Sequence, residues 1–300
     1  MELEILQNTY NKNFFNALNK VEQKIPPIWF MRQAGRYHQH YRKLKEKYSF
    51  EQLCKEPELA CEVTLGPIVE FDFDAAILFS DILFPLDYLG MSLKFNPGPI
   101  FEKNLSSKMI SEFNIDEFES FIDFQNISLK NIRNELSNDK SLIGFTGGPV
   151  TLYHFATRNN PVSQTLFQQT LPVLEMLIQK NIQIQLQNDI DLLMIFDTEA
   201  NKLNDKDFDE FVIPFLVKIS NIYPNKIGYF TKEISQTKFN KLQNLKNLKL
   251  TVLGTNLEVF TELPKTHLSL QGNFSNDLLA MEDTKSCLLY TSDAADDRDS

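Results

Sequence analysis

Two arginines stand close together near the start of the chain, in a motif that could bind anions. The motif consists of Arg32, Gln33, Ala34, Gly35 and Arg36. It follows the apolar run Ile28–Met31, which has the length of a buried strand. Guanidinium groups at the end of a buried strand are costly to leave unpaired, and they bind carboxylates or phosphates bidentately. The spacing therefore predicts an anion pocket, although a loop whose arginines pair with surface acids explains it equally well.

A carboxylate follows the next apolar run along the chain. In Phe79-Ser80-Asp81-Ile82-Leu83, Asp81 stands between apolar side chains at the expected end of a strand. Such an aspartate can accept hydrogen bonds from nearby loop N–H groups. It can also face a partly dry pocket, where its charge would stabilise a neighbouring cation, including one formed during a reaction. Both interpretations remain open at this point.

Two further strand ends carry residues that could contact a ligand. The segment 144–152 contains three glycines, which permit a tight turn and close approach of a ligand. The segment lacks the Lys-Ser/Thr ending of a phosphate loop, and a plain strand-to-helix turn is the simpler interpretation. Thr198 follows another apolar run, where it could donate a hydrogen bond to a ligand or cap the next element.

Seven short apolar runs are the candidate strands of the fold. They are Ile28–Met31, Ala75–Phe79, Ser141–Phe145, Leu192–Phe196, Lys226–Tyr229, Leu248–Leu253 and Leu268–Gln271. Helical patterns separate them: apolar residues recur every three or four positions over 171–186, and 208–222 repeats this with Asp205 or Asp207 as cap. Pro57 is placed to open another helix. This alternation predicts a parallel α/β sheet.

The position of the polar residues distinguishes between two parallel folds. Seven strands fit a (β/α)₈ barrel that lacks one strand, and they also fit an open doubly wound sheet. Arg32, Asp81, Gly147 and Thr198 each follow a different strand. Residues spread over several strand ends favour the rim of a barrel, because a doubly wound sheet gathers them at one switch point. We expect one barrel domain over residues 1–286.

Composition excludes several classes of partner. The formal charge of −10 argues against nucleic acid as the main partner. The chain has three cysteines, Cys54, Cys61 and Cys287, which form no CxxC pair and no disulfide framework. No apolar run approaches the ~20 residues of a membrane span, and the start lacks the pattern of a signal peptide. We therefore expect a cytoplasmic protein. The histidine pair at 38 and 40 is expected to be solvated rather than bound to metal.

Four segments together resemble the uroporphyrinogen decarboxylase family. They are Pro27–Arg36, Asp74–Leu83, Gly144–Leu152 and Leu270–Asn273, and they occur in the order found in that family. The resemblance implies a TIM barrel that forms a homodimer. It also implies a carboxy-lyase of haem and porphyrin biosynthesis that removes four CO₂ units from the acetate side chains of uroporphyrinogen III, giving coproporphyrinogen III. The resemblance implies no cofactor and no metal.

The same resemblance assigns roles to individual residues. Asp81 would stabilise the cationic pyrrole ring, and Arg32 would hold a carboxylate and help deliver a proton. The residues implied to bind substrate are Arg32, Gln33, Ala34, Gly35, Arg36, Asp81, Phe155 and Thr198. Phe155 stands where the family has a tyrosine, and Thr198 where it has a serine. The chain reads His38-Gln39-His40 where the family commonly has Leu-Pro-Glu.

The C-terminal segment does not continue the pattern. Residues 287–300 resemble the translation of a sequencing adapter, so we expect a non-native tail there and exclude it from the fold. The family's late Gly-His segment has no match in the chain, and the eighth strand is expected to be missing with it. Two other functions stay open: a corrinoid-linked methyltransferase of the same superfamily, and a porphyrin-binding protein without catalytic activity.

Overall fold

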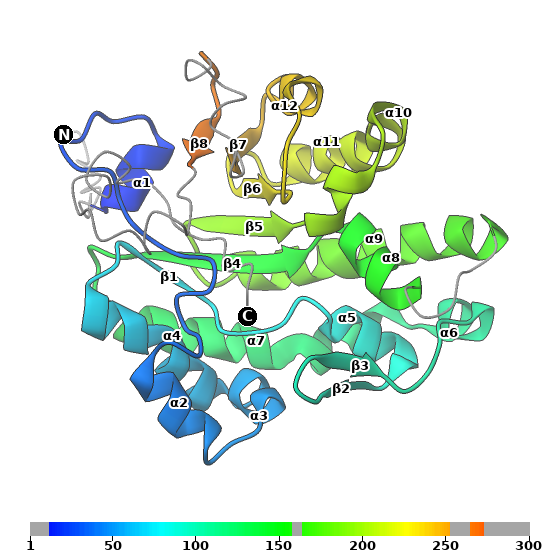
Figure 1. The fold of residues 1–300 in the computed structure, drawn as a ribbon, viewed down its shortest axis with the longest axis horizontal. Coiled ribbons are helices and arrows are strands. Elements are labelled where there is room, and N and C mark those ends of the chain that lie inside the picture. Colours follow the sequence, from blue (N-terminus) through cyan, green and yellow to red (C-terminus); the bar gives the residue numbers. More distant parts are fainter. Residues whose placement is uncertain (1–11, 158–163, 253–264, 273–300) are drawn as a thin grey trace, which may run out of the picture.

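A six-stranded parallel sheet forms the centre of the molecule (Figure 1). The computed structural model describes residues 12–157, 164–252 and 265–272. The strands of this sheet are β1 (Ala75–Ile77), β4 (Ser141–Gly147), β5 (Leu192–Phe196), β6 (Ile227–Phe230), β7 (Leu248–Val252) and β8 (Ser269–Gln271). Their spatial order equals their order in the chain. A doubly wound sheet would reverse its order at a switch point, so the topology is that of a half-barrel.

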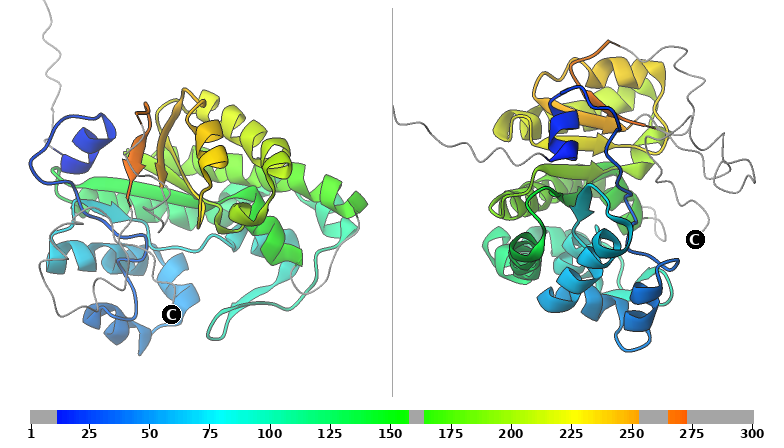
Figure 2. Two further views of the ribbon diagram at one scale, coloured as in Figure 1. Left: turned by 45° about the horizontal axis from the view of Figure 1, so that its top comes forward. Right: turned by 90° about the vertical axis from the view of Figure 1, so that its left-hand side faces the viewer.

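Helices precede and follow these strands. They are α1 (Asn13–Leu18), α2 (Gln39–Lys45), α3 (Phe50–Lys55), α4 (Pro57–Phe71), α5 (Phe84–Leu86), η1 (Asp87–Met91), α6 (Ser107–Glu112), α7 (Ile115–Glu135), α8 (Pro149–Thr157), α9 (Gln164–Leu186), η2 (Thr198–Lys202), α10 (Asp205–Asp207), η3 (Phe208–Val212), α11 (Ile213–Ile222) and α12 (Gln236–Leu242). The long helix α7 packs against α4 on one side and α9 on the other, along the outside of the sheet (Figures 1 and 2). None of the helices in the described ranges is long and apolar enough to cross a membrane.

Six of the seven predicted strands are confirmed, and the first is wrong. Residues 28–31 have no strand conformation, although the N–H of Ile28 donates to the side-chain Oδ2 of Asp74 at 2.7 Å and the Ile28 carbonyl accepts from the N–H of Asp74 at 2.9 Å, just before β1. Trp29 is buried and packs edge-to-face on Phe14, with ring centroids 6.1 Å apart. Trp29 is therefore buried by packing against α1, and the run makes no ladder of strand hydrogen bonds.

Two local features differ from the expectations. An antiparallel hairpin of β2 (Leu93–Phe95) and β3 (Pro99–Phe101) forms a separate two-stranded sheet, and no sequence pattern predicted it. The expected caps Asp205 and Asp207 are wrong, because Asn204 caps this helical segment by accepting from the N–H of Asp207 at 2.9 Å.

Pro57 opens α4 as predicted, in the first turn where its missing N–H costs nothing.

The N-terminal helix covers the last described strand. Ser269 in β8 donates its hydroxyl proton to the Leu18 carbonyl at 2.7 Å, and Figure 2 shows α1 beside β8. The middle strands are fully covered: every residue of β4 is buried, as are Leu192–Ile195 in β5. The strands lead from this apolar core to one edge, where the predicted site residues gather.

Candidate active site

The arginine loop is fixed to the sheet through Gln33. Its side chain is 1% exposed; Nε2 donates to the Ala75 carbonyl at 3.0 Å, and Oε1 accepts from the N–H of Phe30 at 3.2 Å. A buried amide with both ends bonded holds the backbone firmly. The structure thus uses the side chain of Gln33 to hold the loop, while Ala34 and Gly35 continue the turn.

The two guanidinium groups of this loop are exposed and have no protein partner in the part of the chain that the structure describes. No carboxylate there lies within 4.0 Å of Arg32 or Arg36. Arg42 instead braces the loop from α2, donating from Nη1 to the carbonyls of Arg36 and Tyr37 at 3.0 and 2.9 Å. A braced loop that presents unpaired guanidinium groups fits the anion-binding interpretation better than pairing with surface acids.

Asp81 lies at the carboxyl end of β1, in the segment that runs on from the strand. Its Oδ1 accepts from the N–H of Leu83 at 2.8 Å, so the loop-acceptor interpretation holds. Burial raises the pKa of Asp81 to about 6, while the Leu83 N–H and the Arg32 guanidinium act in the opposite direction. The functional interpretation is supported as well, because the charge of Arg32 in the predicted anion pocket acts on this carboxylate.

Two groups near Asp81 are held in their neutral forms. Cys54 of α3 is buried nearby, and burial together with the Asp81 carboxylate raises the pKa of its thiol well above the usual range. Burial raises the pKa of the Tyr41 hydroxyl in α2 to about 12, while the charge of Arg36 acts in the opposite direction. Both groups keep their protons at neutral pH, whereas Lys45, Glu51 and Lys55 are charged groups that also act on the Cys54 thiol.

The glycine turn after β4 is explained by close packing. A Cβ atom on Gly148 would lie 2.2 Å from Cγ of Asp197, and one on Gly147 would lie 3.2 Å from Cβ of Ile82. The turn is therefore held between the Asp81 segment on one side and Asp197 on the other. Of the two interpretations of this segment, the strand-to-helix turn accounts for the contacts observed.

Sequence reasoning missed Asp197. This carboxylate is fully buried; Oδ1 accepts from the N–H of Thr151 at 2.7 Å, and Oδ2 accepts from the hydroxyl of Tyr229 at 3.4 Å. Burial raises its pKa to about 6, against the effect of these hydrogen bonds. Asp197 holds the first turn of α8, the helix that carries Phe155. Its position directly after a predicted strand was the available signal, and the adjacent Thr198 has the same signal.

The remaining predicted residues lie at neighbouring strand ends. Phe155 is half-buried on α8, and Thr198 is the half-buried first residue of η2 after β5. The structure thus places Asp81, Phe155 and Thr198 after three adjacent strands, β1, β4 and β5. Gly272 follows β8, while position 273 and the predicted tail 287–300 lie outside the described residues.

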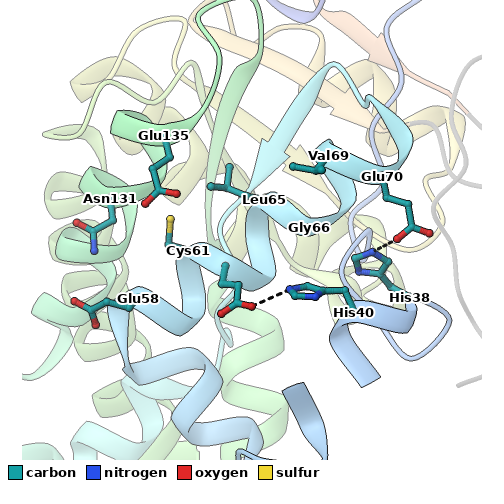
Figure 3. A pocket seen from close by; sticks show the side chains of 11 residues that line it. His38, His40, Glu58, Cys61, Leu65, Gly66, Val69, Glu70, Asn131 and Glu135 are labelled. Atoms are coloured by element: carbon teal, nitrogen blue, oxygen red, sulfur yellow. Dashed lines mark hydrogen bonds and ion pairs between the residues drawn. The ribbon is translucent and has the colours of Figure 1, made fainter. Parts of the chain in front are cut away.

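A groove of about 620 Å³ lies elsewhere, between α4, α7 and the start of α2 (Figure 3). His38 in its wall pairs with Glu70 at 2.7 Å, and His40 pairs with Glu62 at 3.1 Å. The expectation of a solvated histidine pair is wrong for His38, which is 1% exposed. Gly66 in α4 leaves room for its ring, because a Cβ there would lie 2.9 Å from Cε1 of His38.

Comparison with known proteins gives the family. The family model described as uroporphyrinogen decarboxylase (URO-D) matches residues 9–289. The chain belongs to the uroporphyrinogen decarboxylase family. A curated uroporphyrinogen decarboxylase of Geotalea daltonii is 34% identical over 224 residues, which cover 70% of this chain and 66% of that protein. This match spans slightly less than two thirds of the relative's length.

Other members of the uroporphyrinogen decarboxylase family match at similar levels. The enzyme of Ruthia magnifica is 37% identical over 76% of this chain and 70% of its own length, and that of Thermodesulfovibrio yellowstonii is 31% identical over 87% and 80%. Among solved structures, a methyltransferase from Methanosarcina mazei superposes with a TM-score of 0.67 at 16% identity, covering 88% of this chain and 82% of that one. At that identity the likeness shows the barrel fold alone.

Proposed function

We propose that this member of the family removes the four acetate carboxyl groups of uroporphyrinogen III to give coproporphyrinogen III. The observation that carries the proposal is the placement of Asp81 at the end of β1 near Arg32, whose guanidinium has no partner among the described residues. An unpaired cation beside a carboxylate of raised pKa suits a substrate that bears carboxylates and becomes cationic during reaction.

The chemistry needs only proton transfers and charge stabilisation. A pyrrole ring carbon takes up a proton; the C–C bond to the carboxylate then breaks, and its electron pair moves into the cationic ring as CO₂ leaves. The exocyclic carbon next takes up a proton and becomes a methyl group, and the ring carbon loses its own. Each acetate thus consumes one proton and releases one CO₂. The ring cation before bond breaking is the species that a carboxylate stabilises.

The site residues divide these tasks in our proposal. Arg32 and Arg36 hold substrate carboxylates, which suits their exposure on a braced loop. Asp81 faces the ring N–H groups and stabilises the cation. Thr198 and Phe155 contact the substrate from the neighbouring strand ends, with the threonine hydroxyl as a hydrogen-bond donor. A single barrel domain over 1–286, a homodimer and a cytoplasmic location belong to the same proposal.

The test is Asp81→Asn in the full chain, assayed by conversion of uroporphyrinogen III to coproporphyrinogen III. We expect kcat to fall by about 10²-fold or more, the loss typical of one charge-stabilising group. The variant should be at least as stable as the parent at pH 7.5. Because burial raises the folded pKa of Asp81, its contribution to stability is present at low pH and is lost as the pH rises through about 6.

Three other outcomes would redirect the assignment. Retained activity in a folded Asp81→Asn variant would remove Asp81 from the mechanism. Tight binding of uroporphyrinogen without turnover by the parent chain would support a porphyrin-binding protein. Stoichiometric zinc in the purified parent would revive the methyltransferase interpretation.

A further inference from the structure

Strand β1 leaves the sheet well before its neighbour ends. β1 stops at Ile77, and the last backbone contact between the two strands is from the N–H of Leu78 to the Ile143 carbonyl at 3.0 Å. Beyond it Phe79 turns to α4, donating its N–H to Oγ1 of Thr64 at 2.9 Å. β4 continues to Gly147, so the backbone of Phe145 faces a side from which the strand has departed.

The side chain of Gln185 takes the place of the missing strand. Its Oε1 accepts from the N–H of Phe145 at 2.9 Å, and its Nε2 donates to the Phe145 carbonyl at 2.7 Å. Gln185 comes from α9 and is 0% exposed. Gly144 makes room for it, because a Cβ at that position would lie 2.5 Å from Oε1 of Gln185. One amide thus satisfies both backbone groups that the sheet would otherwise leave unpaired.

A second buried amide extends this contact to the segment that leads to Asp81. Nε2 of Gln185 donates to Oδ1 of Asn181 at 2.8 Å and also lies 3.2 Å from Oε1 of Gln125 in α7. Nε2 of Gln125 in turn donates to Oγ of Ser80 at 2.8 Å. Gln125 is 2% exposed. Gln185, Gln125 and Ser80, which we call the amide chain, connect β4 to the residue directly before Asp81. Nε2 of Gln125 donates to Oγ of Ser80, so displacing Ser80 would remove a hydrogen-bond partner from this buried amide.

We propose that Gln125 is a positioning residue: through Ser80, the amide chain fixes where the carboxylate of Asp81 lies at the end of β1. The catalytic part of this inference rests on the function proposed above. Among the residues that the structure describes, Asp81 itself accepts only from the Leu83 N–H, and that contact is within its own turn. The turn therefore needs an anchor outside itself, and the amide chain supplies one from two helices and a strand.

The same two helical segments offer a matched control. Nδ2 of Asn188, just beyond α9, donates to Oδ1 of Asn126 in α7 at 2.8 Å, one position along from Gln125. This contact joins the same segments without reaching Ser80. A role limited to joining α7 and α9 would therefore be equally sensitive to the loss of either contact.

The experiment compares Gln125→Leu, Gln125→Glu and Asn188→Leu with the parent full chain, using uroporphyrinogen III as substrate. In Gln125→Leu we expect kcat to fall by about 10²-fold, as for a misplaced catalytic group, with KM changed by less than about twofold. Gln125→Glu, as a buried neutral acid, still accepts from Gln185 and donates to Ser80, so it should recover most of kcat. Asn188→Leu should leave both constants near those of the parent.

A second readout does not depend on turnover. In chains with ¹³C-labelled aspartate, the Asp81 carboxyl signal is assigned by its absence in Asp81→Asn, and its titration is followed by NMR. We expect Gln125→Leu to lower the pKa of Asp81 toward the usual aspartate value, because the released segment admits water, while Asn188→Leu leaves it unchanged.

These results separate the two proposals. If the parent decarboxylates uroporphyrinogen but Gln125→Leu keeps its kcat, or Asn188→Leu loses as much, the positioning role is overturned and the function stands. If the parent shows no decarboxylation, the function fails and the NMR titration alone decides. An Asp81 titration that is the same in Gln125→Leu and the parent overturns the inference.

Discussion

Two aspartates at neighbouring strand ends show how local contacts separate structural from reactive groups. Burial raises the pKa of both Asp81 and Asp197 to about 6. Asp197 accepts from Thr151 and Tyr229 on its two oxygens and is closed off from solvent. Asp81 is partly exposed and, within the described ranges, accepts a single hydrogen bond, which leaves acceptor capacity for a ligand.

The raised pKa of Asp81 predicts an acid limit to activity. The carboxylate must be ionised to stabilise a cation, so kcat/KM should fall as the pH drops through about 6. The Arg32 guanidinium favours the ionised form of Asp81. Removing it in Arg32→Gln should therefore shift the fall in kcat/KM at acid pH to a higher pH. Rates of CO₂ release between about pH 5 and pH 8 measure this fall in the parent and in Arg32→Gln. If the fall occurs at the same pH in Arg32→Gln as in the parent, Arg32 does not influence the pKa of Asp81 as proposed.

At the scale of elements, the site is assembled from segments that the sheet does not itself include. The arginine loop is tied to β1 by Gln33 and to α4 by His38, whose Nε2 lies 2.7 Å from Glu70. His38 is also the first residue before α2, and its N–H donates to the Gly35 carbonyl at 2.9 Å. Moving His38 would therefore displace the loop that carries both arginines.

We predict that His38→Ala weakens substrate binding and that His40→Ala does not. Both glutamates are about half exposed, but His38 is buried whereas His40 is 40% exposed, and pairs exposed on both sides contribute little. Loss of the His38–Glu70 contact should raise KM by about tenfold, equivalent to roughly one hydrogen bond, with a smaller effect on kcat. Steady-state kinetics of the two variants, with melting temperatures recorded, give the comparison. Equal KM values in the two variants would show that the His38–Glu70 contact does not position the arginine loop.

At the scale of the whole molecule, the charge and the site have opposite signs. The chain carries a formal charge of −10, while the arginine loop presents two guanidinium groups without a partner among the described residues. A substrate with eight carboxylates is repelled by the molecule as a whole and attracted by the loop. Local attraction must dominate for the proposed substrate to bind.

Ionic strength separates these two contributions. In the parent, raising salt from about 0.05 to about 0.5 M should raise KM by about tenfold, because the arginine contacts are exposed to screening. In Arg32→Gln/Arg36→Gln only the overall repulsion remains, so salt should lower KM from its elevated value. Initial rates over a salt series, with a neutral osmolyte as control, give the two slopes. Slopes of the same sign would show that the arginines do not bind the carboxylates.

The sheet could be predicted from sequence because its strands are buried on both faces. Continuous apolar runs such as Leu192–Phe196 reveal themselves in composition, and this strand has the predicted bounds. The same signal failed for Ile28–Met31, since burial by packing and burial in a ladder give the same apolar pattern. The cap at Asn204 was missed because several neighbouring residues can cap equally well, and backbone geometry chooses among them.

The sequence by itself determined the alternation of strands and helices, the arginine motif and the aspartate after the second predicted strand. These depend on residue type and local spacing, and the family resemblance rests on the same segments. Only the tertiary structure decided that Arg36 and Arg32 stay unpaired among the described residues, that Asp197 is enclosed, and that Gln125 reaches Ser80 across 45 positions. Such contacts join residues far apart in the chain, so they depend on how the helices pack over the sheet. Local residue spacing does not predict that packing.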